Sequence, residues 1–153
     1  PFDAVAAAAF TGYEIGAKLK STATPGRVWT NYLDGNVANP DVDDTGWAAS
    51  DPLYVTDAPA AGTFNDVVLP GASDYALDID TAAGNVVHTG FVAQRNGQKL
   101  FLSNTGANLY TVDALIGSAA NNQVRGIPGG LTIVQNQTLT LEYVADLNKW
   151  LFV

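Results

Sequence analysis

The sequence predicts an all-β protein, in which a small N-terminal β-hairpin module precedes an antiparallel, jelly-roll-like β-sandwich. Residues 75–80 alternate strictly, with Tyr75, Leu77 and Ile79 on one face, which is the pattern of a half-buried strand. Similar short segments recur at regular spacing with turn signals between them. No stretch after the N-terminus has a helical period, so this spacing favours a sandwich or jelly-roll.

The further strands of the sandwich are expected at residues 86–93, 99–103, 110–115, 131–134, 139–144 and 149–153. The turn signals between them contain Gly, Asn or Pro and lie at residues 83–85, 96–97, 105–108, 128–130 and 136–137. Asn96-Gly97 is the strongest hairpin signal among them. Residues 51–62, which include Pro52 and Pro59, indicate a linker. We therefore expect two domains, residues 1–56 and 57–153, with the boundary near Thr56.

Composition and charge narrow the class of protein. The chain has 153 residues, of which 47% are hydrophobic and 14% charged, enough to bury a core. Its net charge of -8 repels phosphate backbones and anionic bilayers, which argues against a nucleic-acid partner and against membrane insertion. The chain has no cysteine, so a disulfide or thiolate metal site is excluded. Its first residue, Pro1, and the absence of methionine suggest a piece of a longer polypeptide.

Residues 4–10 form the only early apolar run. This run is far shorter than the roughly 20 residues of a membrane-spanning helix, and it lacks the basic flank of a signal sequence. We expect one short helix or an apolar lead-in here, packed on the hairpin or on a neighbouring subunit.

Aromatic residues punctuate the glycine, proline and asparagine turns between Gly12 and Trp47. Tyr13, Trp29, Tyr32 and Trp47 lie in a module that is small for four buried rings, so one or two of them could face outward and stack on a sugar ring. The competing and favoured interpretation is that Trp29 and Trp47 form the core of the module or pack against a neighbouring subunit. Exposure is expected most for Tyr32, because it precedes the turn at residues 33–36.

No residue pattern in the chain predicts catalysis. His88 is the single histidine, with no serine elbow or cysteine to pair with it, so a structural or merely exposed role is favoured. Only Glu14 and Glu142 are glutamates, and no spacing singles out a hydrolase-like carboxylate pair. Asp78 and Asp80 share a strand face, where acidic residues are usually solvated. The sequence therefore predicts no enzyme and no cofactor.

Residues 41–46 begin like a calcium loop, with the pattern D-x-D-x-x-G. The pattern fails at its twelfth position, where Pro52 stands in place of a bidentate glutamate. A looser calcium site is the alternative, but we expect a solvated acidic turn and no metal.

Residues 12–47 resemble a small β-hairpin module of chitin-binding domains that also recurs in bacteriophage tail-fibre proteins. The matching positions are Tyr13, Gly16, residues 17–20, Pro25-Gly26, Val28-Trp29, residues 36–40 and Trp47. The chitin-binding version carries a second aromatic pair beside its central strand, and here only Tyr32 can serve. The resemblance makes sugar binding possible without implying it.

The C-terminal part has its own resemblance, to a β-sandwich module of phage tail-fibre and tail-tip proteins. The matching segments are residues 64–69, 89–91, 97–106, 141–143 and 148–150. Proteins of these fibre families are typically parallel homotrimers. The resemblance implies a homotrimer here, with the N-terminal module toward the virion and the sandwich toward the host.

Three functions compete at this point. The first is a non-enzymatic phage tail-fibre or tail-tip segment in the extracellular virion, which contacts other tail or baseplate proteins and a host cell-surface glycan or pilus protein. The second is a carbohydrate-binding accessory module of a secreted polysaccharide-degrading enzyme. The third is a purely structural spacer that trimerises the fibre. The long resemblance of residues 64–153 favours the first.

Overall fold

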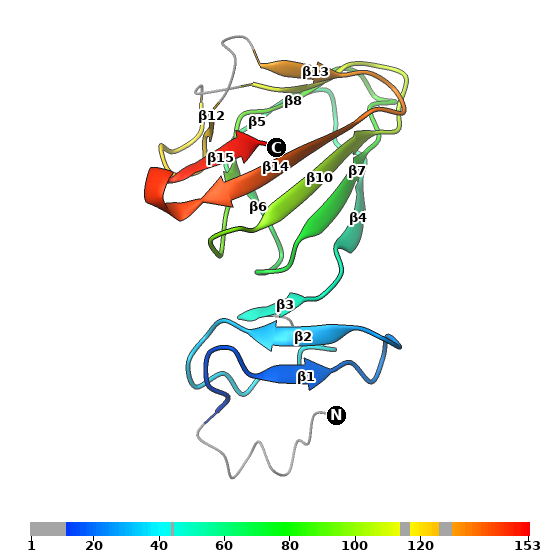
Figure 1. Ribbon diagram of the computed structural model, residues 1–153. Helices are drawn as coiled ribbons and strands as arrows, with labels where there is room; N and C mark the ends of the chain where they lie inside the picture. Colours follow the sequence, from blue (N-terminus) through cyan, green and yellow to red (C-terminus); the bar gives the residue numbers. More distant parts are fainter. Residues whose placement is uncertain (1–11, 44, 114–116, 126–129) are drawn as a thin grey trace. The chain divides into compact units, whose positions relative to one another are not determined.

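The computed structural model describes residues 12–43, 45–113, 117–125 and 130–153. The all-β prediction is confirmed: these residues form strands and one short 3-10 turn, η1 (Ala145–Leu147) (Figure 1). The chain divides into two compact units, the first running to Leu53 and including Pro70–Asp74, and the second holding Tyr54–Leu69 and Tyr75–Val153. The predicted domain boundary at Thr56 lies close to Leu53 and Tyr54, where the chain first passes from the first unit to the second. The helix or lead-in expected at residues 4–10 lies outside the described residues.

The first unit contains a three-stranded antiparallel sheet. Its strands β1 (Lys18–Lys20), β2 (Val28–Asn31) and β3 (Trp47–Ala49) lie in the order β1-β2-β3. Trp29 in the central strand pairs with Leu19 on one side and Ala49 on the other. The turn between β1 and β2 uses Gly26 at a φ of 86°, a left-handed conformation that favours glycine. The expected hairpin is therefore the first two strands of a larger sheet.

The strands of the second unit are short and follow one another closely. They are β4 (Leu53–Asp57), β5 (Gly62–Phe64), β6 (Val67–Val68), β7 (Tyr75–Ile79), β8 (Val86–His88), β9 (Phe91–Val92), β10 (Lys99–Asn104), β11 (Tyr110–Val112), β12 (Val124–Arg125), β13 (Leu131–Ile133), β14 (Thr138–Val144) and β15 (Lys149–Phe152). They form a six-stranded sheet in the order β12-β15-β14-β10-β7-β4, a four-stranded sheet in the order β13-β11-β8-β5, and the pair β6-β9.

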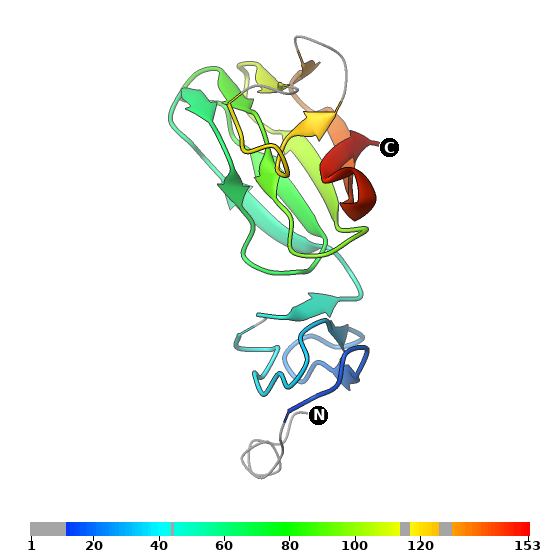
Figure 2. The same ribbon diagram turned by 90° about the vertical axis from the view of Figure 1, so that its left-hand side faces the viewer.

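Successive strands of the second unit wind as coils of a short β-solenoid. Gly62 pairs in parallel with Val86, and Val86 pairs in parallel with Tyr110, 24 positions further along the chain each time. The same offset joins Val67 to Phe91, and an offset of 25 joins Tyr75 to Leu100. The coils therefore run β4-β5-β6, then β7-β8-β9, then β10-β11, and their strands lie side by side in the turned view (Figure 2).

The last strands reverse direction and close the C-terminal end of the solenoid. β13 pairs antiparallel with β11, β14 pairs antiparallel with β10, and β15 pairs antiparallel with β14 (Figure 1). β12 then adds in parallel to β15. These strands satisfy the hydrogen-bonding edge that the third coil would otherwise expose.

The pairing corrects the predicted antiparallel jelly-roll. The two larger sheets are mixed, because each coil returns the chain in the same direction as the coil before it. Asn96-Gly97 does form a turn, with Gly97 at a φ of 70°, but it does not close a hairpin. β9 before this turn pairs with β6, and β10 after it pairs with β7 and β14. The hairpin prediction is therefore wrong.

The predicted linker at residues 51–62 is also wrong, because it contains β4 and the first residue of β5. The segment Leu53-Tyr54-Val55-Thr56 is rich in aromatic and branched side chains that favour a strand. Backbone hydrogen bonds join Leu53 N–H to Asp74 O and Asp80 N–H to Asp57 O, each 2.8 Å long. The prolines lie outside the strand, where the missing N–H does no harm.

The core of the second unit lies between its two larger sheets. Leu100, Leu102 and Leu141 have no exposed surface, and Phe91 meets Trp150 with ring centroids 6.1 Å apart. The indole N–H of Trp150 donates to the backbone oxygen of Phe91 at 2.7 Å. This bond ties the last strand to the second coil, so the C-terminal strands and the coils share one core.

Candidate functional site

The four aromatic residues that the sequence singled out in the first unit differ in their exposure. Trp47 is 0% exposed and Trp29 is 4% exposed, while Tyr13 is half-buried and Tyr32 is 43% exposed. The rings of Tyr13 and Trp47 meet edge to face, with centroids 5.4 Å apart. The expectation that Trp29 and Trp47 form the core of this unit is confirmed, and a sugar has no access to their faces in this structure.

Trp29 is fixed by charged groups around its ring. Its indole N–H donates to Asp41 Oδ1 at 2.9 Å, and the Arg27 guanidinium lies 5.5 Å from the ring centroid. Arg27 in turn makes a two-point ion pair with Asp51, with nitrogen–oxygen distances of 3.0 and 2.8 Å. Asp41 holds the edge of the ring and Arg27 lies over its face, so Trp29 contributes to stability rather than to an open binding face.

Asp41, considered above as a calcium ligand, instead accepts hydrogen bonds from the protein. Ser21 Oγ donates to Oδ1 at 2.6 Å, and the Thr22 N–H and hydroxyl donate to Oδ2 at 2.6 and 2.8 Å. Although partial desolvation opposes it, the bonds from Ser21, Thr22 and Trp29 hold the pKa of Asp41 well below its usual range. In the part of the chain that the structure describes, no group of three or more His, Cys, Asp or Glu side chains could hold a metal ion.

Two buried asparagines complete the frame of the first unit, and sequence reasoning missed both. Asn31 is 0% exposed, and its Nδ2 lies 2.8–2.9 Å from the carbonyl oxygens of Tyr13, Glu14 and Leu33. Asn36 donates from Nδ2 to Asn31 Oδ1 and to the Thr45 carbonyl. For Asn31 the available signal was a polar residue at a strand position that alternation turns inward.

The remaining candidate is the Tyr32 surface, which we define as Tyr32, Leu33 and Val37. These side chains are 43%, 50% and 51% exposed, and they lie in the loop that follows β2. The loop is held from beneath, because Tyr32 N–H donates to the Gly46 carbonyl and Leu33 N–H donates to Asn31 Oδ1. An aromatic ring on a braced loop can stack on a flat apolar ligand.

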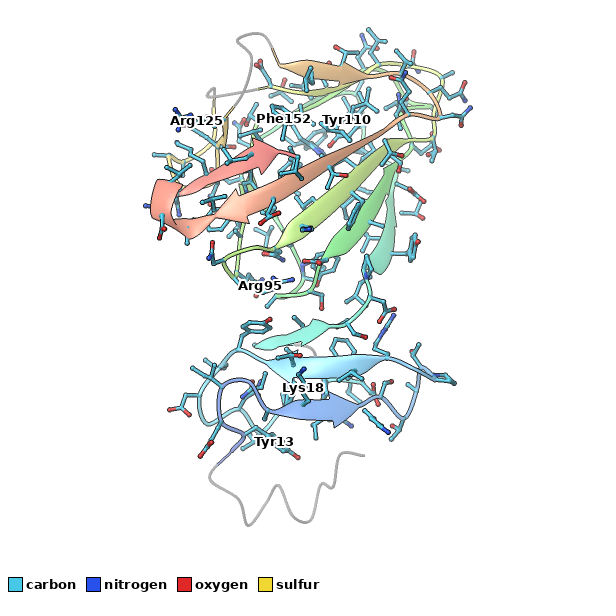
Figure 3. All side chains as sticks on the ribbon, in the orientation of Figure 1. Tyr13, Lys18, Arg95, Tyr110, Arg125 and Phe152 are labelled. Atoms are coloured by element: carbon cyan, nitrogen blue, oxygen red, sulfur yellow. The ribbon has the colours of Figure 1, made fainter. Side chains whose placement is uncertain are left out.

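His88 occupies a buried structural position in the second unit. It is 2% exposed, and its Nδ1 lies 3.0 Å from the hydroxyl of Tyr110. Phe64, Phe91 and Tyr110 surround its ring at centroid distances of 5.2–5.6 Å, and Figure 3 shows Tyr110 inside the unit. Burial lowers the pKa of His88 to about 4, against a small opposing effect of Asp57.

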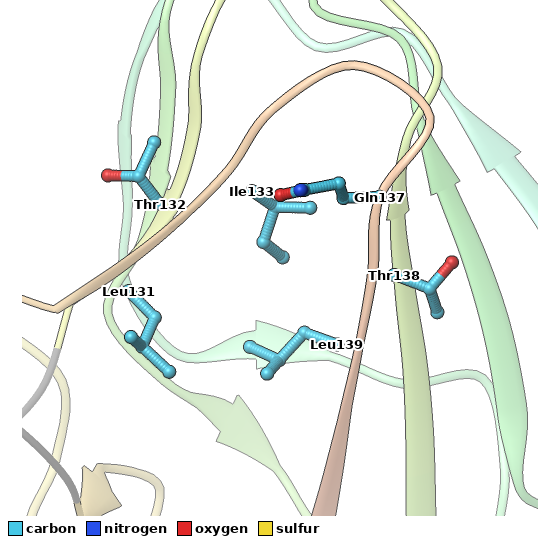
Figure 4. Close-up of a pocket in the computed structure, with 6 residues that line it drawn as sticks. All are labelled: Leu131, Thr132, Ile133, Gln137, Thr138 and Leu139. Atoms are coloured by element: carbon cyan, nitrogen blue, oxygen red, sulfur yellow. The ribbon is translucent and has the colours of Figure 1, made fainter.

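A shallow hollow lies between β13 and β14, where the chain passes from one large sheet to the other (Figure 4). Its lining residues are Leu131, Thr132, Ile133, Gln137, Thr138 and Leu139. None of these residues is ionisable at neutral pH, so the lining holds no acid or base that could activate the hydroxyls of Thr132 and Thr138.

Comparison of the chain with protein-family models, curated proteins and solved structures gives no match. No helix in the described ranges is both long enough and apolar enough to cross a membrane.

Proposed function

We propose that this chain is a non-enzymatic segment of a bacteriophage tail fibre or tail tip that attaches the virion to a host-surface glycan or pilus protein. The observation that carries the proposal is the β-solenoid of the second unit, whose C-terminal end is closed by the last strands. Its parallel coils turn one set of side chains inward and present the alternate set on flat outer sheet faces. Such a stack gives a stiff surface that runs across several strands and can meet an extended ligand.

The proposed assembly is a parallel homotrimer that also contacts other tail or baseplate proteins, in the extracellular virion. The support is the resemblance of residues 12–47 to a module of fibre proteins together with the open edge of the first coil. Val68 in β6 is 74% exposed, whereas Val92, its partner in β9 of the second coil, is half-buried. Packing around a symmetry axis would cover part of this exposed apolar surface.

A second candidate function is a carbohydrate-binding accessory module of a secreted polysaccharide-degrading enzyme. The Tyr32 surface favours it, because an exposed ring on a braced loop suits sugar stacking. In that case the chain would bind insoluble polysaccharide as a monomer, without any preference for whole cells.

Two measurements on the purified chain test the proposal: its mass by light scattering, and its retention on a panel of whole bacterial strains. We expect a trimer that adheres to some strains. A trimer that adheres to none would indicate a structural spacer. A monomer retained on insoluble cellulose or chitin would reject the fibre assignment and support the accessory module.

A further inference from the structure

The outer face of the six-stranded sheet carries a row of side chains that runs across the coils. Phe101 in β10 pairs with Ala76 in β7 on one side and with Thr140 in β14 on the other. The hydrogen bonds at the two ends of β4 align it in parallel with β7, which places Tyr54 beside Ala76. We call Tyr54, Ala76, Phe101 and Thr140 the aromatic row.

Alternation turns this row away from the core. The neighbours of Phe101 in β10, Leu100 and Leu102, are completely buried, whereas Phe101 keeps part of its surface. Tyr54 is 82% exposed. Adjacent strands lie about 4.8 Å apart, so the two rings stand about 10 Å apart with the small Ala76 between them. The row therefore has two aromatic rings, with Ala76 between them only 9% exposed.

A second row beside the aromatic row is polar. Asp78 pairs with Ser103, and Ser103 pairs with Thr138. Ser103 Oγ and Thr138 Oγ1 lie 3.2 Å apart at an exposed position. A carboxylate and two hydroxyls therefore form a row that runs parallel to the aromatic row across three neighbouring strands. Each strand contributes one side chain that can accept a hydrogen bond, and the hydroxyls can also donate one.

These two rows define the chemistry of the occupant. The apolar strip is only one side chain wide, which is narrow for a protein partner, since a stable interface buries about 800 Å² on each side. An anionic polymer is disfavoured by Asp78 and by the net charge of -8. A neutral glycan fits both rows, because each pyranose ring has an apolar face for stacking and a rim of hydroxyls for hydrogen bonding.

We propose that the outer face of this sheet binds a neutral glycan chain, with sugar rings stacked on Tyr54 and Phe101 and sugar hydroxyls bonded to Asp78, Ser103 and Thr138. The glycan runs across the strands, along the direction in which the coils stack. This inference rests on the proposed attachment function, and it names a ligand class and a site different from the Tyr32 surface.

The experiment is an NMR titration of the full ¹⁵N-labelled chain with cellohexaose, maltohexaose and laminarihexaose, with a galacturonic acid hexamer as the anionic comparison. We expect the amide signals of Ala76, Phe101 and Ser103 to shift with at least one neutral hexamer and not with the acidic one. Tyr54→Ala and Phe101→Ala should each weaken that binding about fivefold, the effect of losing about 1 kcal/mol of ring contact.

Val68→Ala is the matched control, because Val68 is an exposed apolar residue of the same first coil but lies in β6, outside this sheet. It should leave the affinity unchanged. Circular dichroism of Tyr54→Ala checks folding, which the exposure of Tyr54 should preserve.

Three outcomes would overturn the inference. Shifts gathered at Tyr32 would move the glycan site to the first unit. The absence of shifts with every neutral hexamer would reject a neutral glycan as the ligand. A solution mass that falls in Tyr54→Ala would show that a second copy of the chain covers the row.

The whole-cell assay separates this inference from the proposed function. If Tyr54→Ala and Phe101→Ala adhere to cells as well as the parent chain, the sheet site is wrong and attachment still stands. If the parent chain binds a hexamer at the row but adheres to no cells, the site stands and host attachment is wrong.

Discussion

The two units solve the same problem, a stable all-β structure without cysteine, in different ways. The first unit places buried polar side chains at its centre, with Asn31 completely buried and Asn36 only 5% exposed. The second unit aligns apolar positions on neighbouring strands, as in Leu77 and Leu102 of two successive coils and Leu139 of the closing strand β14. The first is held by a few individual hydrogen bonds, and the second by many similar contacts.

The difference follows from the amount of apolar surface that each unit can bury. A small module with long loops has little core, so its loops must satisfy their backbone groups through side chains such as Asn31 and Asp41. Stacked coils satisfy their backbone groups on each other and can devote their inward side chains to packing. Damage should therefore be local and abrupt in the first unit, and should spread along the stack in the second.

The largest expected effect is that of Trp150→Ala in the second unit. Trp150 is 0% exposed, packs against Phe91 and Tyr143, and donates its indole N–H to the Phe91 carbonyl. Its removal should cost about 4 kcal/mol of unfolding free energy. Urea unfolding followed by NMR measures this cost, with the indole signals of Trp29 and Trp47 reporting on the first unit separately.

Trp150→Phe is the control, because it keeps a six-membered aromatic ring and loses the pyrrole part of the indole with its N–H, at a cost of about 1–2 kcal/mol. If Trp150→Ala lowers the unfolding midpoint of the first unit as much as that of the second, then the units unfold together and the comparison between them fails.

The strands of the second unit could be predicted more readily than their partners. Strands β7, β10 and β11 were recognisable because alternation marks a strand that has one face in a core. Alternation does not say which strand lies alongside. The equivalent triplets Gly62-Thr63-Phe64, Val86-Val87-His88 and Tyr110-Thr111-Val112 share a pattern but almost no residues. The 24-residue repeat was therefore hidden from sequence reasoning.

The candidate site was also predictable only in part. The burial of Trp29 and Trp47 was predictable, because they are the largest apolar side chains of a small module. The environment of Asp41 was not, because donors to its carboxylate come from Ser21 and Thr22, 20 and 19 positions earlier in the chain. The local sequence does not distinguish an aspartate that is solvated in a turn from one that accepts hydrogen bonds from distant residues.

The second prediction concerns pH and is specific to the second unit. Burial lowers the pKa of His88 from about 6.5 to about 4, so between these values the unfolded chain binds more protons than the folded chain. The stability of the second unit should therefore fall as the pH drops from 6.5 and level off below 4, by roughly 3 kcal/mol in all. Urea unfolding at several pH values measures this slope.

The matched control is the double variant His88→Phe with Tyr110→Phe, which removes the imidazole and the hydroxyl hydrogen-bonded to it. Its stability should lack the dependence between pH 6.5 and 4. A slope that persists in the double variant would assign the pH dependence to other groups.

The third prediction, with the smallest expected effect on stability, concerns Asp41 in the first unit and a lower pH range. Hydrogen bonds hold the pKa of Asp41 below its ordinary value of 3.8, so its stabilising effect is complete above about pH 4 and is lost as the pH falls further. Asp41→Asn should cost about 2 kcal/mol at neutral pH, because a charged acceptor of several donors is replaced by a neutral amide. The NMR signal of the Trp29 indole N–H, which donates to Asp41, should shift in the Asp41→Asn variant.

Asp43→Asn is the control for Asp41→Asn, because Asp43 lies in the same loop and its hydrogen bonds come from the N–H and the side chain of the exposed Thr45. It should leave the stability almost unchanged. The pair also sharpens the comparison between the units, since acid should weaken the second unit from pH 6.5 and the first only below pH 4. If the first unit loosened before the second on acidification, its polar side chains would not be the stabilising frame described above.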